Sequence, residues 1–422
     1  MAIQSVNPYN NKVVKTFEEI TDDELQSKIE IAHNAYLSWK NVPVAERQKL
    51  LLKVASIMRE RKSELARLVT TEMGKLIRQS EGEIEMCASV YEYYANNAAE
   101  FLQDRPMKVD KGRAFVRLTP IGIILAVEPW NYPFNQVGRL TAPNIMAGNV
   151  VLLKHSSNVP QCAAMIEAIF KEAGAPEGVF TNIFLSGKRV DKLAEDKRIA
   201  GLSLTGSEAA GSSLAEAAGR NLKKSVLELG GSDAFVVLDD ADIDRAVEKA
   251  YIGRFANMGQ ACTSAKRIIV IDSIADEFLE KLKQKITGLK VGDPLDPETE
   301  IGPLSTEDAL KKIEQQVNDT VAAGAKVVIG GKRIDREGAF FEFTILTDIK
   351  PGMTAYHEEL FGPVASFYRV KDDDEAIALA NDTNFGLGGV VFSGDTDRAV
   401  NVASRIDTGM VFINQSLASR PD

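Results

Sequence analysis

The stretch IGIILAVEPWNYPFNQVGRLTAPNIMAGNVVLLKH, residues 121–155, places two short apolar runs on either side of a helical segment. The runs at 121–127 and 150–154 have the length and the β-branched residues of buried strands, whereas 135–147 is longer and helix-like. Strands that alternate with helices of about 10–15 residues are typical of βαβ units, whose strands are parallel. This stretch therefore predicts an open α/β fold.

The alternation of strands and helices continues in both directions. Two α/β series are expected, preceded by a helical region of about one hundred residues and a hairpin at 107–118, with a cleft between two domains. The expected helices lie at 21 onwards, 44–75, 81–102, 135–147, 159–173, 207–221, 241–258, 275–288 and 305–323. The further expected strands lie at 179–185, 200–204, 234–238, 268–271, 327–329, 364–370, 388–393 and 410–413.

Composition excludes several classes of protein. The 422 residues include 50 Lys and Arg against 60 Asp and Glu, so the net charge is −10. An acidic chain lacks the concentrated positive field that binds nucleic acids or anionic membranes. No apolar run approaches the roughly 18 residues of a membrane span. We therefore expect neither a nucleic-acid partner nor a membrane.

The three cysteines and three histidines are sparse and widely separated. An odd, small number of cysteines is typical of a reducing compartment, and the N-terminus shows no signal-peptide pattern. These features predict a cytoplasmic protein. No HExxH or CxxC spacing occurs, so we expect no metal site.

Cys262 lies in FANMGQACTSAKR, where small and polar residues form a loop before a strand. Cys87 and Cys162 instead lie in apolar helical runs, as structural cysteines do. Because a loop leaves a thiol accessible, Cys262 is the candidate nucleophile, with a structural role as the alternative. It requires activation, since a free thiol has a pKa of about 8.5.

Glu228 ends an apolar strand in SVLELGGSD. A partly desolvated carboxylate at this position would serve as a general base near neutral pH. The pair Gly230 and Gly231 would allow backbone or cofactor to come close. The alternative is an outward-facing strand residue.

Two further segments follow strand ends, where open α/β sheets bind ligands. In EPWNYPF, residues 128–134, a rigidly held Asn131 beside Trp130 would donate its side-chain N–H to an oxyanion. The alternative is that Asn131 only completes a turn. In LTGSEAAG, Gly206 and Ser207 begin a helix whose free amides suit a phosphate. The segment is neither GxGxxG nor a Walker loop, and a plain N-cap serine is the alternative.

Taken in order, EPWNYP, LTGS, LELGG, GQAC and EELFGPV resemble the aldehyde dehydrogenase superfamily, over nearly the whole chain. The resemblance implies that the Cys262 thiolate attacks an aldehyde, and that Asn131 and the Cys262 backbone amide hold the oxyanion of the thiohemiacetal. Hydride transfer to a nicotinamide leaves a thioester, which water activated by Glu228 hydrolyses.

The same resemblance implies an NADP site, with NAD as the alternative. Lys154 would bind the adenosine ribose, and many NAD-specific relatives have a glutamate three residues later, where this chain has Ser157. A carboxylate there would repel a 2′-phosphate, whereas serine accepts it. The implied cofactor-binding residues are Trp130, Lys154, Ser156, Ser157, Gly206, Ser207, Leu229, Glu359 and Phe361.

Arg139 is similar to an arginine of the family's succinate-semialdehyde dehydrogenases, where its guanidinium would bind the distal carboxylate of the substrate. A surface salt bridge is the alternative. Some of those enzymes have a second arginine six residues before the cysteine, where this chain has Ala256. A broader aldehyde specificity thus stays open.

By resemblance, residues 1–105 and 119–227 form a Rossmann-like cofactor-binding domain, 106–118 an oligomerisation hairpin and 228–415 a catalytic domain. The family continues beyond INQSLASRPD, so we expect a truncated tail at 416–422, an incomplete β arm and a weakened dimer or tetramer, with loss of activity as an alternative. A cysteine hydrolase, a non-catalytic scaffold and a coenzyme-A-acylating enzyme are the rival classes.

Overall fold

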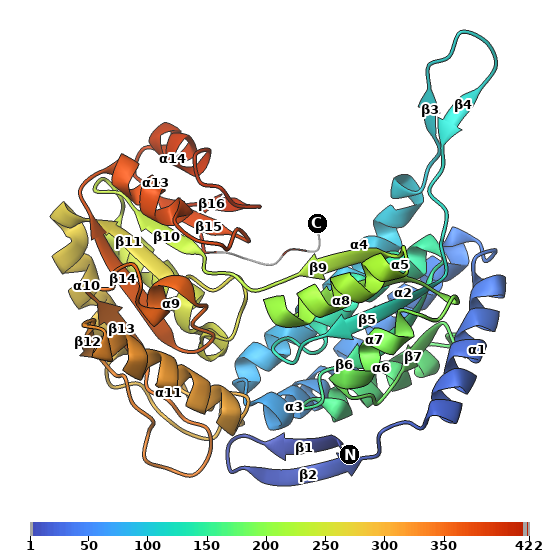
Figure 1. The fold of residues 1–422 in the computed structure, drawn as a ribbon, viewed down its shortest axis with the longest axis horizontal. Coiled ribbons are helices and arrows are strands. Elements are labelled where there is room, and N and C mark those ends of the chain that lie inside the picture. Colours follow the sequence, from blue (N-terminus) through green and yellow to red (C-terminus); the bar gives the residue numbers. More distant parts are fainter. Residues whose placement is uncertain (1–2, 417–419, 421–422) are drawn as a thin grey trace.

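The computed structural model describes residues 3–416 and 420, which form two lobes, each built on its own sheet (Figure 1). The first sheet has five parallel strands in the order β7-β6-β5-β8-β9. Its strands are β5 (Ile123–Glu128), β6 (Val150–His155), β7 (Phe180–Asn182), β8 (Ile199–Thr205) and β9 (Lys224–Glu228). The prediction of a parallel sheet from residues 121–155 is therefore confirmed.

Helices cover this first sheet, and several have clear start or stop signals. Thr21 forms a capping box with Glu24, which satisfies free amides at the first helix. Gly148 ends α5 in the left-handed conformation that glycine adopts without strain. The helices are α1 (Asp22–Trp39), α2 (Val44–Glu60), α3 (Lys62–Met73), α4 (Ile77–Phe101), α5 (Asn135–Ala147), α6 (Pro160–Glu172), η1 (Gly187–Arg189), α7 (Val190–Leu193) and α8 (Glu208–Arg220).

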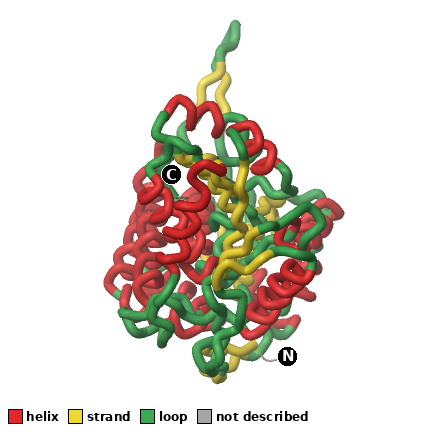
Figure 2. The backbone as a smooth tube through the Cα atoms, turned by 90° about the vertical axis from the view of Figure 1, so that its left-hand side faces the viewer, coloured by secondary structure: helices red, strands yellow, loops and turns green. Residues whose placement is uncertain are grey.

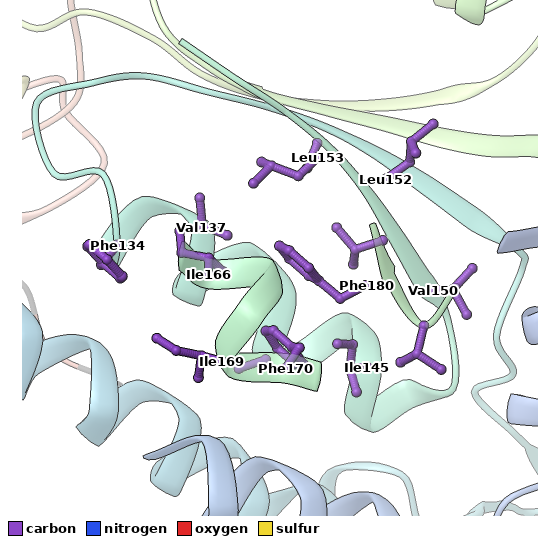
Figure 3. Close-up of a cluster of buried hydrophobic side chains, with 14 of the residues drawn as sticks. Phe134, Val137, Ile145, Val150, Leu152, Leu153, Ile166, Ile169, Phe170 and Phe180 are labelled. Atoms are coloured by element: carbon purple, nitrogen blue, oxygen red, sulfur yellow. The ribbon is translucent and has the colours of Figure 1, made fainter. Parts of the chain in front are cut away.

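The core of the first lobe lies between the sheet and helices α5 and α6 (Figure 3). Phe170 of α6 and Phe180 of β7 stack with ring centroids 4.6 Å apart. Val137 and Ile145 of α5 are fully buried beside them. This close packing gives the end of β5 and the start of α5 a rigid base.

The second sheet has seven strands in the order β12-β13-β14-β11-β10-β15-β16. Only the β12–β13 pair is antiparallel. Its strands are β10 (Ala234–Val237), β11 (Arg267–Ile271), β12 (Lys326–Ile329), β13 (Thr344–Thr347), β14 (Val364–Val370), β15 (Gly389–Phe392) and β16 (Val411–Ile413). Its helices are α9 (Ile243–Phe255), η2 (Ala256–Gly259), α10 (Asp272–Ile286), α11 (Glu307–Ala322), α12 (Thr354–His357), α13 (Asp373–Asn381) and α14 (Thr396–Ala403).

Two hairpins lie outside these sheets. The predicted hairpin is present as β3 (Arg105–Met107) and β4 (Ala114–Val116), and it projects away from the body of the molecule (Figures 1 and 2). The other hairpin, β1 (Ile3–Asn7) with β2 (Lys12–Phe17), lies under the first lobe.

The predicted fold class, α/β with two sheet-based units, is confirmed, with corrections at element level. The expectation of helices throughout the first hundred residues is wrong for β1 and β2, where the β-branched residues of IQSVN and KVVKTF favour strands, which pair as an antiparallel hairpin. The helix expected at 241–258 ends at Phe255, because the backbone turns left-handed at Asn257. Most of the predicted tail, 416–422, lies outside the described residues.

Within the described part of the chain, no helix is both long and apolar enough to cross a membrane.

Candidate active site

A cavity of about 280 Å³ lies between the two lobes, at the carboxyl ends of β5 and β8. Eight of the site residues predicted from the sequence meet there: Trp130, Asn131, Gly206, Ser207, Leu229, Cys262, Glu359 and Phe361. The other residues that line it are Pro129, Gln136, Thr205, Gly230, Ala309, Lys312, Ile313 and Gln316. Segments up to 232 residues apart in sequence, from Pro129 to Phe361, thus form one site.

Asn131 is positioned by the loop at 256–262, which carries the predicted nucleophile Cys262 and is called the nucleophile loop. Its side-chain Nδ2 donates to the carbonyl of Gln260 at 3.0 Å, and its own carbonyl accepts from Asn257 Nδ2 at 3.0 Å. Because a carbonyl can only accept, the bond to Gln260 determines which end of the amide is the nitrogen. The second N–H of that nitrogen is left for another acceptor. Asn131 is 4 % exposed, so its amide is in a desolvated place.

A buried ion pair contacts the EPWNYPF segment and restrains it. Lys75 pairs with Glu83, and neither side chain is exposed. Glu83 Oε1 accepts from the backbone amide of Phe134 at 2.9 Å, at the start of α5. The Lys75 ammonium also lies 3.6 Å from the ring centroid of Tyr132. These contacts restrain the residues on the carboxyl side of Asn131.

The loop before Cys262 has a strained backbone. Asn257, Met258 and Gly259 are consecutive left-handed residues with φ of 52°, 56° and 68°. Two of them carry side chains, for which this conformation is costly, of the order of 1 kcal/mol each. At Gly259 a Cβ would collide with the backbone of Gly362. The surrounding contacts must therefore compensate for this conformation.

Arg254, the penultimate residue of α9, supplies several of these contacts. It is fully buried, and burial lowers the pKa of its guanidinium to about 9. All its hydrogen-bond acceptors are neutral oxygens, on both sides of the loop. They are the carbonyls of Gly259, Leu360, Gly362 and Val364 and the hydroxyl of Ser264. Arg254 therefore joins the GQAC segment to the EELFGPV segment.

The glycine pair of LELGG allows close approach, as predicted. A Cβ on Gly231 would lie 2.6 Å from the carbonyl oxygen of Cys262, and one on Gly230 would strike the carboxylate of Glu359. Gly231 N donates to Glu359 Oε1 at 3.2 Å. Glycine at both positions is therefore required for this packing.

Burial raises the pKa of the Cys262 thiol above its ordinary value. The ammonium of Lys266 opposes that effect, while the carboxylates of Asp233 and Glu359 add to it. Burial also raises the pKa of Asp233 to about 6. The other cysteines, Cys87 and Cys162, are buried in the first core, which confirms their assignment as core residues.

Glu228 requires a correction. It ends β9 but is exposed and does not line the cavity, so the expected partial desolvation of its carboxylate is wrong. Its backbone carbonyl accepts from Gly206 N at 2.9 Å, which ties LELGG to LTGS. β9 is an edge strand of its sheet, and four of its five residues, Glu228 included, are exposed.

Ser207 is the N-cap of α8, which is the alternative role that the sequence predicted for it. Its hydroxyl accepts from Ala210 N at 3.3 Å. The residue also lines the cavity, so the start of α8 faces the same space as Cys262. The first amides of a helix have no intrahelical acceptor and suit a negatively charged group.

The structure separates the remaining predicted residues from the cavity. Lys154 in β6 is half-buried, and burial lowers its pKa. Ser156 and Ser157 follow it and line a separate small hollow beside His155. Arg139 is exposed on α5, one turn beyond Gln136, which does line the cavity.

Sequence reasoning missed several residues that line the cavity or adjoin the segments that line it. Glu128 is 3 % exposed and burial raises its pKa well above the usual range, although it reads as an ordinary strand-end residue. Lys312 and Gln316, one turn apart on α11, line the cavity. Their charged and polar character at (i, i+4) spacing resembles any solvated helix face, so no sequence signal distinguished them. Lys266 was also passed over, although it stands four residues after Cys262.

A dinucleotide fits the residues present. The cavity combines the start of α8, a carboxylate at Glu359 and the rings of Trp130 and Phe361, whose centroids are 5.7 Å apart. Among residues 3–416 and 420, no three or more His, Cys, Asp and Glu side chains gather as a metal site would require.

Known proteins resemble the chain over its whole length. It is 50 % identical over 418 residues to the NADP(+) succinate-semialdehyde dehydrogenase of Deinococcus radiodurans, covering 99 % of this chain and 88 % of that protein. It is 46 % identical over 421 residues to a probable succinate-semialdehyde dehydrogenase [NADP(+)] of Synechocystis sp., covering 100 % and 93 %.

A solved structure agrees with these relatives. The crystal structure of succinic semialdehyde dehydrogenase from Streptococcus pyogenes, in complex with NADP+ as the cofactor, superposes with a TM-score of 0.98 at 44 % identity. The match covers 100 % of this chain and 92 % of that one. The comparisons give no support to the predicted C-terminal truncation. Residues 1–422 match the aldehyde dehydrogenase family, and the chain belongs to that family.

Proposed function

We propose that the chain oxidises succinate semialdehyde to succinate with NADP+. The observation that carries this proposal is that the half-buried Cys262 and the Asn131 amide line one cavity, together with most of the predicted cofactor residues. The relatives named as NADP(+) succinate-semialdehyde dehydrogenases, at 50 % and 46 % identity, support the choice of substrate and cofactor.

Cys262 is the nucleophile in this proposal. Its sulfur attacks the aldehyde carbon, and the carbonyl oxygen becomes an oxyanion. That oxygen accepts from the free N–H of Asn131 and from the backbone N–H of Cys262. The position of the Asn131 nitrogen, held by the Gln260 carbonyl, makes this donor pre-organised.

NADP+ would be held by residues of both lobes. The start of α8 with Gly206 and Ser207 suits the pyrophosphate, Glu359 the nicotinamide ribose, and Trp130, Leu229 and Phe361 the ring. Lys154, Ser156 and Ser157 are proposed for the adenosine ribose and its 2′-phosphate. The bound cofactor supplies the hydride acceptor. This division makes residues 1–105 and 119–227 the cofactor-binding domain and 228–415 the catalytic domain.

Glu228 is proposed as the base that activates water to hydrolyse the thioester. Its carboxylate is exposed, so it has direct access to water, and it immediately precedes Leu229, which lines the cavity. Glu228→Gln should therefore block the second half of the reaction while leaving the first. A rapid burst of NADPH, equal to the enzyme concentration and without turnover, is expected in a stopped-flow measurement.

Arg139 is proposed to bind the distal carboxylate of the substrate. It lies one helical turn beyond Gln136, which lines the cavity. Arg139→Ala should raise the KM for succinate semialdehyde far more than the KM for butanal, a neutral aldehyde of the same chain length. Equal changes would rule out this role and favour a broader aldehyde specificity.

The decisive assay is absorbance at 340 nm with NADP+ and succinate semialdehyde, with Cys262→Ala as the control. A hydrolase or a scaffold produces no NADPH, and a coenzyme-A-acylating enzyme produces it only when coenzyme A is present. Absence of NADPH formation by the folded wild type would refute the proposal.

We further propose a cytoplasmic homo-oligomer. The three free cysteines fit a reducing compartment. The projecting β3–β4 hairpin exposes Met107, Phe115 and Val116 to about half of their full extent, as a contact between copies would explain. Light scattering tests this, since Phe115→Ser should lower the measured mass if the hairpin joins two copies.

A further inference from the structure

Lys266 is a buried lysine at the base of the nucleophile loop. It lies directly before β11 and is 1 % exposed. Its ammonium donates to the carbonyl of Ala261 at 2.7 Å, to the carbonyl of Cys262 at 2.8 Å and to Glu359 Oε1 at 2.9 Å. A lysine ammonium has three N–H donors, so each of them has an acceptor.

Two of these acceptors control the peptide group that carries the nucleophile. The Ala261 carbonyl and the Cys262 N–H belong to the same peptide, and that N–H is a proposed oxyanion donor. A cation at the carbonyl polarises the peptide and strengthens its N–H as a donor. The contact also restrains the orientation of this peptide.

The third acceptor, Glu359, is the carboxylate proposed to hold the nicotinamide ribose. It is otherwise restrained by Gly231 N at 3.2 Å. The Lys266 ammonium thus lies between the nucleophile loop and the EELFGPV segment, 5.7 Å from the ring centroid of Phe361. Loss of this cation would release both segments at once.

We propose that Lys266 is a positioning residue that holds the Cys262 peptide and the Glu359 carboxylate in one reactive arrangement and supplies the positive charge that faces the thiolate. The link to the cofactor rests on the proposed function of Glu359, whereas the link to the thiol does not.

The charges around Cys262 determine what removal of Lys266 does. The charged groups that face the thiol are Lys266, Asp233 and Glu359, and only the lysine favours the thiolate. Lys266→Met keeps the length of the side chain and removes the charge, which leaves two carboxylates facing the sulfur. The thiolate is then disfavoured.

The test measures alkylation of Cys262 by iodoacetamide between pH 6 and pH 10, with peptide mapping to identify the modified cysteine. For Lys266→Met we expect the rate constant at pH 7.5 to fall about tenfold and the pH profile to move to higher pH. Lys266→Arg keeps the charge and should restore most of the rate. Lys371→Met, which removes an exposed lysine of the same lobe, is the matched control and should leave the profile unchanged.

Glu359→Gln examines the same arrangement from the other side and does not depend on whether Lys266→Met folds. It removes a carboxylate that disfavours the thiolate and leaves the ammonium, so the alkylation rate at pH 7.5 should rise about threefold. If Lys266→Met and Lys371→Met give the same profile, or if Glu359→Gln lowers the rate, the proposal is wrong.

Steady-state kinetics then separate positioning from simple folding. Lys266→Met should raise the KM for NADP+ and lower kcat, and Lys266→Arg should restore kcat. Alkylation requires neither aldehyde nor cofactor. If the Lys266 variants show the expected alkylation rates but the wild type forms no NADPH, the proposed function is refuted and the role of Lys266 at the thiol stands. Identical kcat and KM in wild type and Lys266→Met would contradict the positioning role.

Discussion

The two ends of the proposed cofactor site differ in how firmly the protein holds them. The strained loop before Cys262 is held by two buried cations. Arg254 donates to backbone carbonyls of the EELFGPV segment, and Lys266 donates to the carbonyls of Ala261 and Cys262. The turn after β6 instead leaves Ser157 exposed and Lys154 only half-buried. We therefore expect substitutions around Cys262 to impair the enzyme strongly. At the adenosine end, one surface side chain can change the preference between NADP+ and NAD+.

The largest effect is expected at the nucleophile itself. Cys262→Ala removes the covalent step, so kcat should fall by about 10³-fold or more. The contacts of Arg254 and Lys266 with the loop should stay intact. NADP+ should still bind, as measured by fluorescence titration. A variant with residual activity within tenfold of wild type would mean that another group performs the attack.

The next effect tests whether the buried hydrogen bonds of Arg254 are needed for stability. Arg254→Met leaves several buried carbonyls without a donor, so the free energy of unfolding should fall by about 3 kcal/mol. Urea denaturation measures it. Arg369→Met, an exposed arginine of β14 with 40 % of its side chain accessible, should cost less than about 1 kcal/mol. Equal losses would show that the buried contacts of Arg254 stabilise the chain no more than an exposed ion pair does.

A smaller effect is expected at the exposed end. Ser157→Glu places a carboxylate where the 2′-phosphate is proposed to bind, so the ratio of kcat/KM for NADP+ to that for NAD+ should fall at least about tenfold. Ser157→Ala removes the hydroxyl without adding charge and should change the ratio less. An unchanged ratio in Ser157→Glu would show that cofactor preference depends on the firmly held end.

The smallest effect concerns Asp233, whose carboxylate faces Cys262. Asp233→Asn keeps the Oδ1 that accepts from Gly388 N and removes a charge that disfavours the thiolate, so alkylation at pH 7.5 should rise about twofold.

The same substitution changes the pH dependence of stability. The pKa of Asp233 is about 6 in the folded chain and 3.8 without burial, so its stabilising contribution is complete below pH 3.8 and is lost as pH rises through 6. Asp233→Asn should lack that fall. A persistent fall between pH 4 and pH 6 in the variant would assign it to another group.

Much of the site was predictable because its residues lie in contiguous motifs. Short segments such as GQAC and LELGG combine a reactive side chain with glycines, and the structure brings both to one cavity. Glu228 shows the limit of this reasoning. Its apolar neighbours predict a shielded carboxylate, but β9 lies at a sheet edge, and strand order is a non-local property that the sequence of one strand does not encode.

The sequence by itself determined the alternation of strands and helices, the two α/β units and the residue types that carry the chemistry, because periodicity and turn residues act over short distances. Only the tertiary structure decided which charged side chains are buried to support the segments that carry Asn131 and Cys262. No sequence signal distinguishes Lys75, Arg254 or Lys266 from surface cations, yet each is buried against carbonyls, a ring or a carboxylate. The effect of Lys266 on the Cys262 thiol arises from desolvation and proximity, which exist only once the chain has folded.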